Sequence, residues 1–370
     1  MDAPIPLVDL VAQQAEIADE VRPLLEGVLR RAAFVGGPEV QRFESDFADY
    51  LGAAHCVAVA NGTDAIEIAL RAVGVGPGSE VILPANTFIA TAGAVVRAGA
   101  LPVLVDVDDE YLLMDPLKVA DAVTPRTRAV VPVHLFGQAA PVEKILGAID
   151  GSGIVVVEDA AQSQGARRHG QACGTLGSVA GTSFYPGKNL GAAGDAGAIV
   201  TDDAEVARLS RLLANHGSAR KYVHEVVGFN SRLDTVQAVI LSAKLARLDK
   251  WNQARRDAAQ RYDRLLADAP GVRLPQTMPG NEHVWHLYVV RVPGRDRVLE
   301  YLHERGIGAG IHYPQPVHLT DAFRNIGIDR VEFPVSERAA EEILTLPLFP
   351  HVTVEQQERV VSVLREALVS

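Results

Sequence analysis

The 370-residue sequence has few cysteines, no long apolar run and no excess of positive charge. Only Cys56 and Cys173 are present, too few for a disulfide framework or a four-cysteine zinc site. The longest apolar runs, such as AVVPVHLF, are too short to cross a bilayer. The first residues lack the basic and apolar regions of a signal peptide. These features predict a cytoplasmic protein without a membrane span.

The net charge of −11 disfavours a nucleic-acid partner, because binding to a phosphate backbone needs a basic surface. A small anionic ligand is compatible with it, since a local group of donors can bind one. Hydrophobic residues make up 48% of the chain and charged residues 22%, which is typical of a globular protein with ample core. The length allows two or three domains.

Short apolar segments alternate with helical periodicity over the first two thirds of the chain. The expected strands are 56–61, 80–85, 101–108, 127–137 and 153–161. The expected helices are 37–52, 63–74, 87–99 and 140–150. This alternation predicts an α/β fold with a mostly parallel sheet covered by helices on both faces. In such sheets ligands bind beyond the carboxyl ends of the strands.

The pattern changes after about Leu233. A long helical stretch rich in Arg, Ala and Leu is followed by an expected strand at 283–292 and a helix at 295–306. We interpret residues 1–240 as a large domain and residues 241–370 as a smaller C-terminal α+β domain, joined by the long helix.

The segment SFYPGKNLGAAGDAGAIV, residues 183–200, contains one lysine, Lys188, among small residues and glycines. A lysine held in a tight, partly desolvated pocket loses proton affinity and becomes a nucleophile for carbonyl groups. Small neighbours would leave room for a flat ring over the amine. We therefore expect Lys188 to be catalytic.

Asp159 follows three valines at the mouth of an expected strand, where a carboxylate needs a cation or strong donors. It could serve a metal, a sugar hydroxyl or a protonated ring nitrogen, or it could cap a following helix. No group of His, Asp and Glu surrounds it at ligand spacing, so no metal site is predicted. His283 and His286 are expected to pack, whereas His312 and His318 are better donors to an anion.

The sequence NGTDA connects an apolar strand to a helix. Gly62 permits close backbone approach, and the free N–H groups of the first helical turn, with the Thr63 hydroxyl, can bind an anion. An ordinary helix cap is the alternative. Ser183 could bind a phosphate and Phe88 could stack on a ring. With Lys188 and Asp159, these are the parts that a pyridoxal phosphate site requires.

Ten segments match, in order, the pattern of one family. They are GPEVQRFE, NGTDAIEIAL, PANTFIATAGAVVRAGALPVLVDVD, VHLFGQ, EDAAQSQGA, SFYPGKNLGAAGDAGAIVT, NHG, GFNSRLDTVQA, HYPQPVH and TLPLFP. On these segments the chain resembles the sugar aminotransferases of the DegT/DnrJ/EryC1/StrS family. The resemblance implies the type I fold of pyridoxal-phosphate-dependent transferases and the cofactor pyridoxal 5'-phosphate.

The resemblance also implies roles for individual residues. Lys188 would bind the cofactor covalently and later move the proton between cofactor and substrate carbons, while Asp159 would keep the pyridine nitrogen protonated. Gln162 would bind the ring hydroxyl and Phe88 would stack on the ring. The residues implied to hold the phosphate are Gly62, Thr63, Ser183 and, from the neighbouring subunit of a homodimer, Asn230. Those implied to bind a nucleotide diphosphate are His216, Arg220, Lys221, Tyr313 and His318. The role of His134 is not fixed by the sequence.

Some relatives carry histidine in place of the lysine and act as dehydratases, so Lys188 favours amino transfer. Gln162 and the flanking segments resemble members that act at C3 of a dTDP-linked 3-keto-6-deoxyhexose, with glutamate as the expected amino donor. The alternatives are a C4 aminotransferase acting on a 4-keto sugar, an enzyme acting on a cyclitol ketone, and a non-catalytic sensor or scaffold that binds the cofactor or a sugar nucleotide. A plain α/β binding protein with a coincidental lysine is the least favoured.

Overall fold

The computed structural model describes residues 3–324, 326 and 331–369, and its centre is a seven-stranded sheet with the order β1-β9-β8-β5-β4-β2-β3. The strands are β1 (His55–Val59), β2 (Glu80–Pro84), β3 (Leu101–Val105), β4 (Thr127–Val130), β5 (Val155–Asp159), β8 (Val179–Ser183) and β9 (Gly197–Thr201). Only β9 runs against the others, because it pairs antiparallel with both β1 and β8. The predicted mostly parallel sheet is therefore confirmed.

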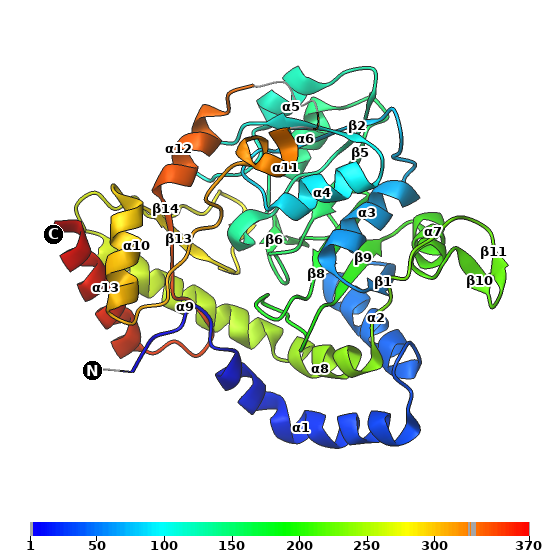
Figure 1. Cartoon of the computed structure of the whole chain (residues 1–370), viewed down its shortest axis with the longest axis horizontal. Coiled ribbons are helices and arrows are strands. Elements are labelled where there is room, and N and C mark those ends of the chain that lie inside the picture. The colour runs from blue at the N-terminus through cyan, green and yellow to red at the C-terminus, as the bar shows by residue number, and fades with distance from the viewer. Residues whose placement is uncertain (1–2, 325, 327–330, 370) are drawn as a thin grey trace.

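Helices cover both faces of this sheet (Figure 1). They are α2 (Pro38–Leu51), α3 (Gly62–Ala72), α4 (Ile89–Arg97), α5 (Pro116–Ala122), α6 (Val142–Ala148), α7 (Ala204–Ala214) and α8 (Thr235–Leu245). Helix α1 (Leu10–Arg31) packs on α8 instead. Because successive strand residues point to opposite faces, Val81 and Leu83 pack with α3 and α4, whereas Ile82 packs with α5 and α6. The continuous apolar strands of the sequence are those of a sheet buried on both sides.

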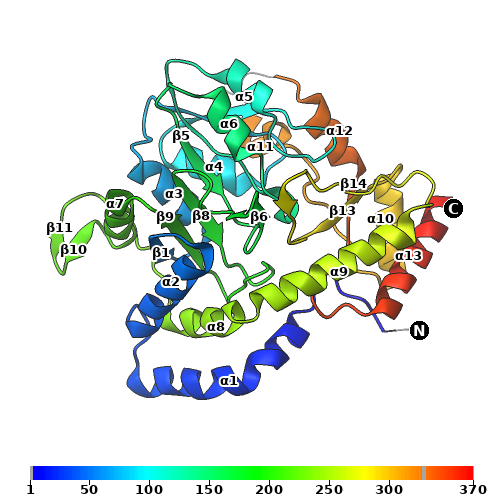
Figure 2. The same cartoon turned by 180° about the vertical axis from the view of Figure 1, so that it is seen from behind.

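A second apolar core lies in the C-terminal part of the chain. Its elements are α9 (Leu248–Leu266), β13 (Tyr288–Arg291), α10 (Arg295–Glu304), β14 (Ile343–Leu346) and α13 (Val354–Val369). Helix α12 (Pro334–Glu342) precedes β14 and packs through Ala339 into a separate cluster with Leu113 and Val289. The N-terminal segment joins this core through Ile5, which is 2% exposed and forms a bridge with Ile307. Figure 2 shows α9 running from the end of α8 into this second body.

Two expected elements differ in the structure. The long helix is two helices, because the Arg247 amide donates to the Lys244 carbonyl at 3.0 Å and so tightens the last turn of α8 before α9 begins. The expected strand at 283–292 begins only at Tyr288. Trp285 has a positive φ of 48°, which interrupts an extended chain, and its amide donates to the His283 side chain at 2.8 Å.

The smaller elements lie around the edges of the sheet. A three-stranded sheet consists of β12 (Asn281–Glu282), β6 (Arg167–Arg168) and β7 (Gln171–Ala172). A hairpin of β10 (Ser218–Arg220) and β11 (Val223–His224) projects beyond α7 at one end of the molecule (Figure 1). The short helices are η1 (Leu135–Gly137), η2 (Val317–Leu319) and α11 (Asp321–Arg324). Within the described ranges, no helix combines the length and apolar character needed to cross a bilayer.

Candidate active site

A cavity of about 460 Å³ lies at the carboxyl ends of the parallel strands. Strands β5 and β8 end at Asp159 and Ser183, and β1 leads through Asn61 into α3. This is where the parallel topology predicts a ligand site. The cavity brings together nine of the residues expected from the sequence, namely Gly62, Thr63, Phe88, Asp159, Gln162, Ser183, Lys188, His312 and Tyr313.

Lys188 lies in a tight turn that follows β8, with its amide donating to the Tyr185 carbonyl at 2.8 Å. The turn depends on small residues, since a Cβ on Gly191 would come within 2.2 Å of the Pro186 carbonyl oxygen. Burial lowers the pKa of Lys188 to about 8, while the charge of Asp159 opposes this shift. At pH 7 about a tenth of the molecules therefore carry the neutral amine that attacks carbonyls, far more than for an exposed lysine.

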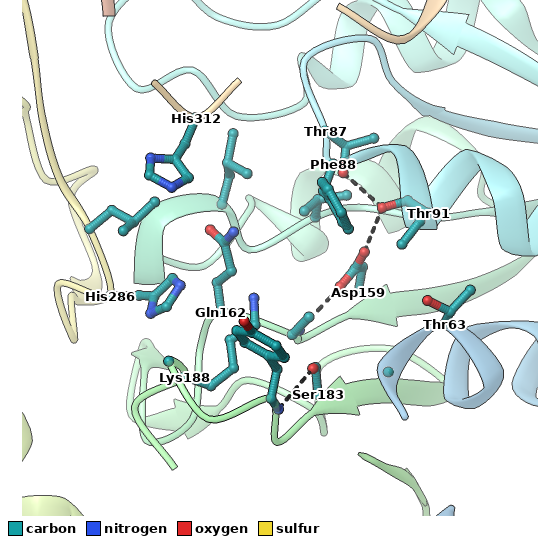
Figure 3. A pocket seen from close by; sticks show the side chains of 18 of the residues that line it. Thr63, Thr87, Phe88, Thr91, Asp159, Gln162, Ser183, Lys188, His286 and His312 are labelled. Carbon is teal, nitrogen blue, oxygen red and sulfur yellow. Dashed lines mark hydrogen bonds between the residues drawn. The ribbon is translucent and has the colours of Figure 1, made fainter. Parts of the chain in front are cut away.

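Asp159 is 5% exposed, and burial raises the pKa of its carboxyl group. Two donors oppose this shift: the Thr91 hydroxyl at 2.7 Å from Oδ2 and the Ala161 amide at 3.1 Å from Oδ1. Figure 3 shows the carboxylate between Thr91 and Lys188. A turn rather than a helix follows Asp159, so the helix-cap alternative is excluded.

The N-terminus of α3 forms an anion-binding corner of the cavity. The Asn61 side chain accepts the Asp64 amide at 2.8 Å, which leaves the amides of Gly62 and Thr63 without a helical partner. A Cβ on Gly62 would lie 2.5 Å from the Ser183 Cβ, so only glycine lets the helix approach β8 this closely. The Ser183 hydroxyl and the helix N-terminus therefore face one small space that suits a phosphate.

Gln162 has a fixed orientation. Its Oε1 accepts the Phe136 amide at 2.6 Å, and its Nε2 donates to the Tyr313 hydroxyl at 3.0 Å. The remaining Nε2 hydrogen can only donate, so a ligand group that meets it must be an acceptor, such as an ionised ring hydroxyl. Phe88 is half exposed and contacts the Tyr313 ring at a centroid distance of 5.1 Å.

One histidine of the cavity goes beyond the sequence predictions. His286, which was expected to pack, lines the cavity together with His312, an expected donor (Figure 3). The Asn189 amide nitrogen donates to Asn252 and to the Val284 carbonyl, at 2.8 Å and 2.9 Å, so its oxygen accepts Nδ1–H of His286 at 3.1 Å. This leaves Nε2 of His286 as an acceptor.

Burial lowers the pKa of His286 well below its ordinary value and that of His312 to about 4. Both rings are therefore neutral near Lys188. His286 lies in the apolar segment HVWHLYVV, where nothing in the neighbouring sequence predicts that it lines a ligand cavity.

The local sequence did not predict several other residues that line the cavity either. Leu7 and Val8 come from the N-terminal segment, and Asp195 and Tyr185 flank the lysine turn. His134, whose role the sequence left open, is fully buried and bonds Glu158 at 2.7 Å between Nε2 and Oε2. This bond holds Glu158 near the end of β5, and His134 does not line the cavity.

Five expected ligands do not line this cavity. His318 bonds Glu337 at 2.9 Å and packs against the Phe333 ring. Arg220 and Lys221 are exposed in the β10–β11 hairpin, with His216 at its base and exposed Asn230 bridged to Asn215. In a single chain these five residues therefore do not gather around the cavity. Among the residues that the structure describes, the charged side chains that line the cavity, histidines aside, are Lys188, Asp159 and Asp195.

Comparison with known proteins identifies the family. The model of the DegT/DnrJ/EryC1/StrS aminotransferase family matches residues 15–365. The chain is 45% identical to dTDP-3-amino-3,4,6-trideoxy-alpha-D-glucose transaminase of Streptomyces venezuelae, over 98% of this chain and 96% of that protein. It is 46% identical to a pleiotropic regulatory protein of Geobacillus stearothermophilus, over 98% of each. The crystal structure of S. venezuelae DesV with a ketimine intermediate superposes with a TM-score of 0.96, at 44% identity, over 99% of this chain and 98% of that one.

The fold and site define a pyridoxal-phosphate-dependent transferase of fold type I. The chain belongs to the DegT/DnrJ/EryC1/StrS aminotransferase family, and the predicted aminotransferase activity and cofactor are confirmed.

The residues present fit this cofactor. The Gly62 corner, which a Cβ would fill, suits the phosphate, and the Lys188 amine suits the aldehyde. Asp159 suits the ring nitrogen because its carboxylate opens on the cavity.

Proposed function

We propose that the protein transfers an amino group from glutamate to C3 of a nucleotide-linked 3-keto-6-deoxyhexose, a dTDP sugar. The observation that carries the proposal is the Lys188 amine, whose pKa is lowered to about 8, in one cavity with Asp159. The S. venezuelae relative, whose named product carries its amino group at C3, supports the sugar and its position.

In this proposal each side chain has one task. When bound, pyridoxal phosphate supplies a carbonyl that takes up the amino group and a ring that accepts the electron pair left when a C–H bond breaks. Lys188 removes that proton from the donor carbon and later returns one to the sugar carbon. Asp159 holds the proton on the ring nitrogen, and Gln162 donates to the ring oxygen. Gly62, Thr63 and Ser183 hold the phosphate in place.

The choice between C3 and C4 is tested with glutamate and a keto-sugar nucleotide. The unstable 3-keto substrate is generated in place by an isomerase, and NMR of the product locates the new nitrogen. We expect a C3 amine that forms only with the isomerase, and no product with Lys188→Ala. Efficient formation of a C4 amine without the isomerase would instead identify a C4 aminotransferase and leave the roles of Lys188 and Asp159 intact.

A second candidate function follows from the similarity to a protein named as regulatory. A sensor would bind the cofactor or the sugar nucleotide without turnover. The paired Lys188 and Asp159 favour catalysis, because binding alone needs no amine of lowered pKa. Release of 2-oxoglutarate that depends on the keto sugar distinguishes the two, since a sensor would bind the sugar nucleotide and release none.

We further propose that the active enzyme is a homodimer with shared sites. Phosphate and diphosphate groups carry several negative charges, whereas the cavity of one chain offers Lys188 and otherwise neutral donors. Arg220 and Lys221 lie on the hairpin that projects beyond α7 (Figure 1), and neither lines the cavity of its own chain. Tyr222 and Val227 of the same region are 82% and 95% exposed, which suits contact with a partner subunit. The hairpin and Asn230 would then serve the partner's site.

A further inference from the structure

Two buried threonines lie behind Asp159, on the side away from Lys188 (Figure 3). Thr91 is in the first turn of α4 and is fully buried, and Thr87 precedes that helix and is 2% exposed. The Thr91 hydroxyl lies 2.7 Å from Asp159 Oδ2, and the Thr87 hydroxyl lies 2.7 Å from that of Thr91. The three side chains form a continuous chain of hydrogen bonds.

The direction of this chain is set by what each group can donate. An ionised carboxylate only accepts, so the single hydroxyl hydrogen of Thr91 points to Asp159. The Thr91 oxygen is then free to accept from Thr87. Because Asp159 Oδ1 accepts the Ala161 amide at 3.1 Å, each carboxylate oxygen has one fixed donor and a further lone pair for the cavity.

This arrangement is not the usual one for a helical threonine. Threonine hydroxyls within helices commonly bond the carbonyl one turn earlier. Thr91 instead bonds a side chain 68 residues away in sequence, on the neighbouring strand β5. The other charged or titratable groups that act on Asp159 are Lys188, His134 and Tyr313. Burial and the charge of Asp159 raise the pKa of Tyr313, so Tyr313 is a neutral phenol beside the carboxylate.

We propose that Thr91, supported by Thr87, is a positioning residue that keeps Asp159 ionised and aims its carboxylate at the ring nitrogen of the cofactor. The proposal rests on the proposed role of Asp159. A buried carboxylate without such donors would take up a proton and could no longer hold the ring nitrogen protonated. Thr87 and Thr91 also line the cavity, but their hydroxyls bond each other and Asp159, so the hydroxyl chain acts on the cofactor through Asp159.

The test compares Thr91→Val, which keeps the shape and removes the hydroxyl, with Thr91→Ser, which keeps the hydroxyl. Thr87→Val removes only the outer donor. Thr201→Val is the matched control, because Thr201 is 3% exposed and donates to the Ser178 carbonyl at 2.9 Å at the far end of β9. The readouts are the Asp159 carboxyl titration by ¹³C NMR in the cofactor-free protein, assigned with Asp159→Asn, and the dissociation constant for pyridoxal phosphate.

We expect Thr91→Val to raise the pKa of Asp159 and to weaken cofactor binding ~10-fold, the loss of one hydrogen bond to a charged group. Thr87→Val should do the same to a smaller extent, and Thr91→Ser and Thr201→Val should resemble the unmodified protein. An Asp159 titration in Thr91→Val equal to that of Thr201→Val would overturn the proposal. If Thr91→Val does not fold, the other two variants decide. The proposal would be overturned if Asp159 titrated normally in Thr87→Val and had a raised pKa in Thr91→Ser.

The ring-nitrogen role is judged separately. Unchanged protonation of the bound cofactor in Asp159→Asn, by ¹⁵N NMR, would refute the role of Asp159. The carboxyl titration would still decide whether the threonines set its ionisation.

Discussion

Burial, more than any neighbouring charge, lowers the pKa of Lys188 and so makes its amine reactive. Its pKa of about 8 predicts that trapping of pyridoxal phosphate by borohydride rises with pH through a midpoint near 8 and levels off only at higher pH. Below the midpoint most of the amine is protonated and does not attack a carbonyl. Mass spectrometry of the trapped adduct between pH 6 and 10 measures the midpoint.

Asp159 provides the control for this midpoint. Its charge raises the pKa of Lys188, so Asp159→Asn should move the midpoint to lower pH. Lys244 is an internal comparison: burial lowers its pKa to about 8 too, but it lies on α8 and does not line the cavity. An adduct at Lys244, or a midpoint near that of an exposed lysine, would show that Lys188 is not the reactive amine.

Asp159→Asn itself should retain the fold and lose most turnover. The amide keeps an oxygen for the Ala161 amide, so the local turn survives, but it cannot hold the ring nitrogen protonated. Loss of a fixed electrostatic interaction of this kind reduces kcat by ~10²-fold or more. Steady-state kinetics with thermal unfolding of the same sample measures both effects, and near-normal turnover would reduce Asp159 to a structural group.

Which residues could be predicted follows from how local their signals are. Gly62, Ser183 and Lys188 stand where a strand ends and small residues begin, so the sequence identifies them directly. No such local pattern identifies Thr91 or His286, because in the sequence they are ordinary residues of an expected helix and an expected strand. Their roles arise from partners far away in sequence, Asp159 for Thr91 and Asn189 for His286.

Elements were predictable where apolar periodicity was strong. The sheet strands expected at 56–61 and 80–85 correspond to β1 and β2, and the helix expected at 37–52 to α2. Helix α1 was not among the expected elements. Its apolar pattern is weak because only one side of the helix is in contact, with α8. The break between α8 and α9 was not predictable either, because no glycine or proline marks it.

At the level of elements, the close approach of α3 to β8 is the most sensitive contact of the site. Gly62→Ala would place a Cβ 2.5 Å from that of Ser183 and so force the helix away from the strand. We expect the cofactor-free protein to lose about 1–3 kcal/mol of unfolding free energy. We also expect weaker binding of pyridoxal phosphate, because the phosphate corner widens. Denaturant unfolding and cofactor titration measure the two effects.

Gly76→Ala is the matched control. A Cβ at Gly76 meets nothing within 4 Å, and its backbone does not need glycine. It should leave both measurements within error of the unmodified protein. Equal stability of Gly62→Ala and Gly76→Ala would show that the helix can shift without cost.

At the scale of the whole molecule, the binding of phosphate groups requires positive charges near the cavity, and one chain does not place Arg220 and Lys221 there. With a net charge of −11, cations must be concentrated locally to hold a phosphate and a diphosphate. The structure instead separates Arg220 and Lys221 from the cavity in the same chain. No local pattern in the sequence could reveal this separation, because it depends on the direction in which the hairpin leaves α7.

Shared sites predict complementation between two impaired subunits. Lys188→Ala dimers lack the amine in both sites, and Asn230→Ala dimers should be weakened in both. In a hybrid dimer, Lys188 of the Asn230→Ala subunit would meet Asn230 of the Lys188→Ala subunit and complete one site, while the other site would carry both lesions. We therefore expect about half of the unmodified activity per hybrid dimer, measured after purification through two different affinity tags. If each site used only residues of its own chain, the hybrid would be no more active than half of an Asn230→Ala dimer. That result, in a preparation shown to contain hybrids, would contradict the shared site.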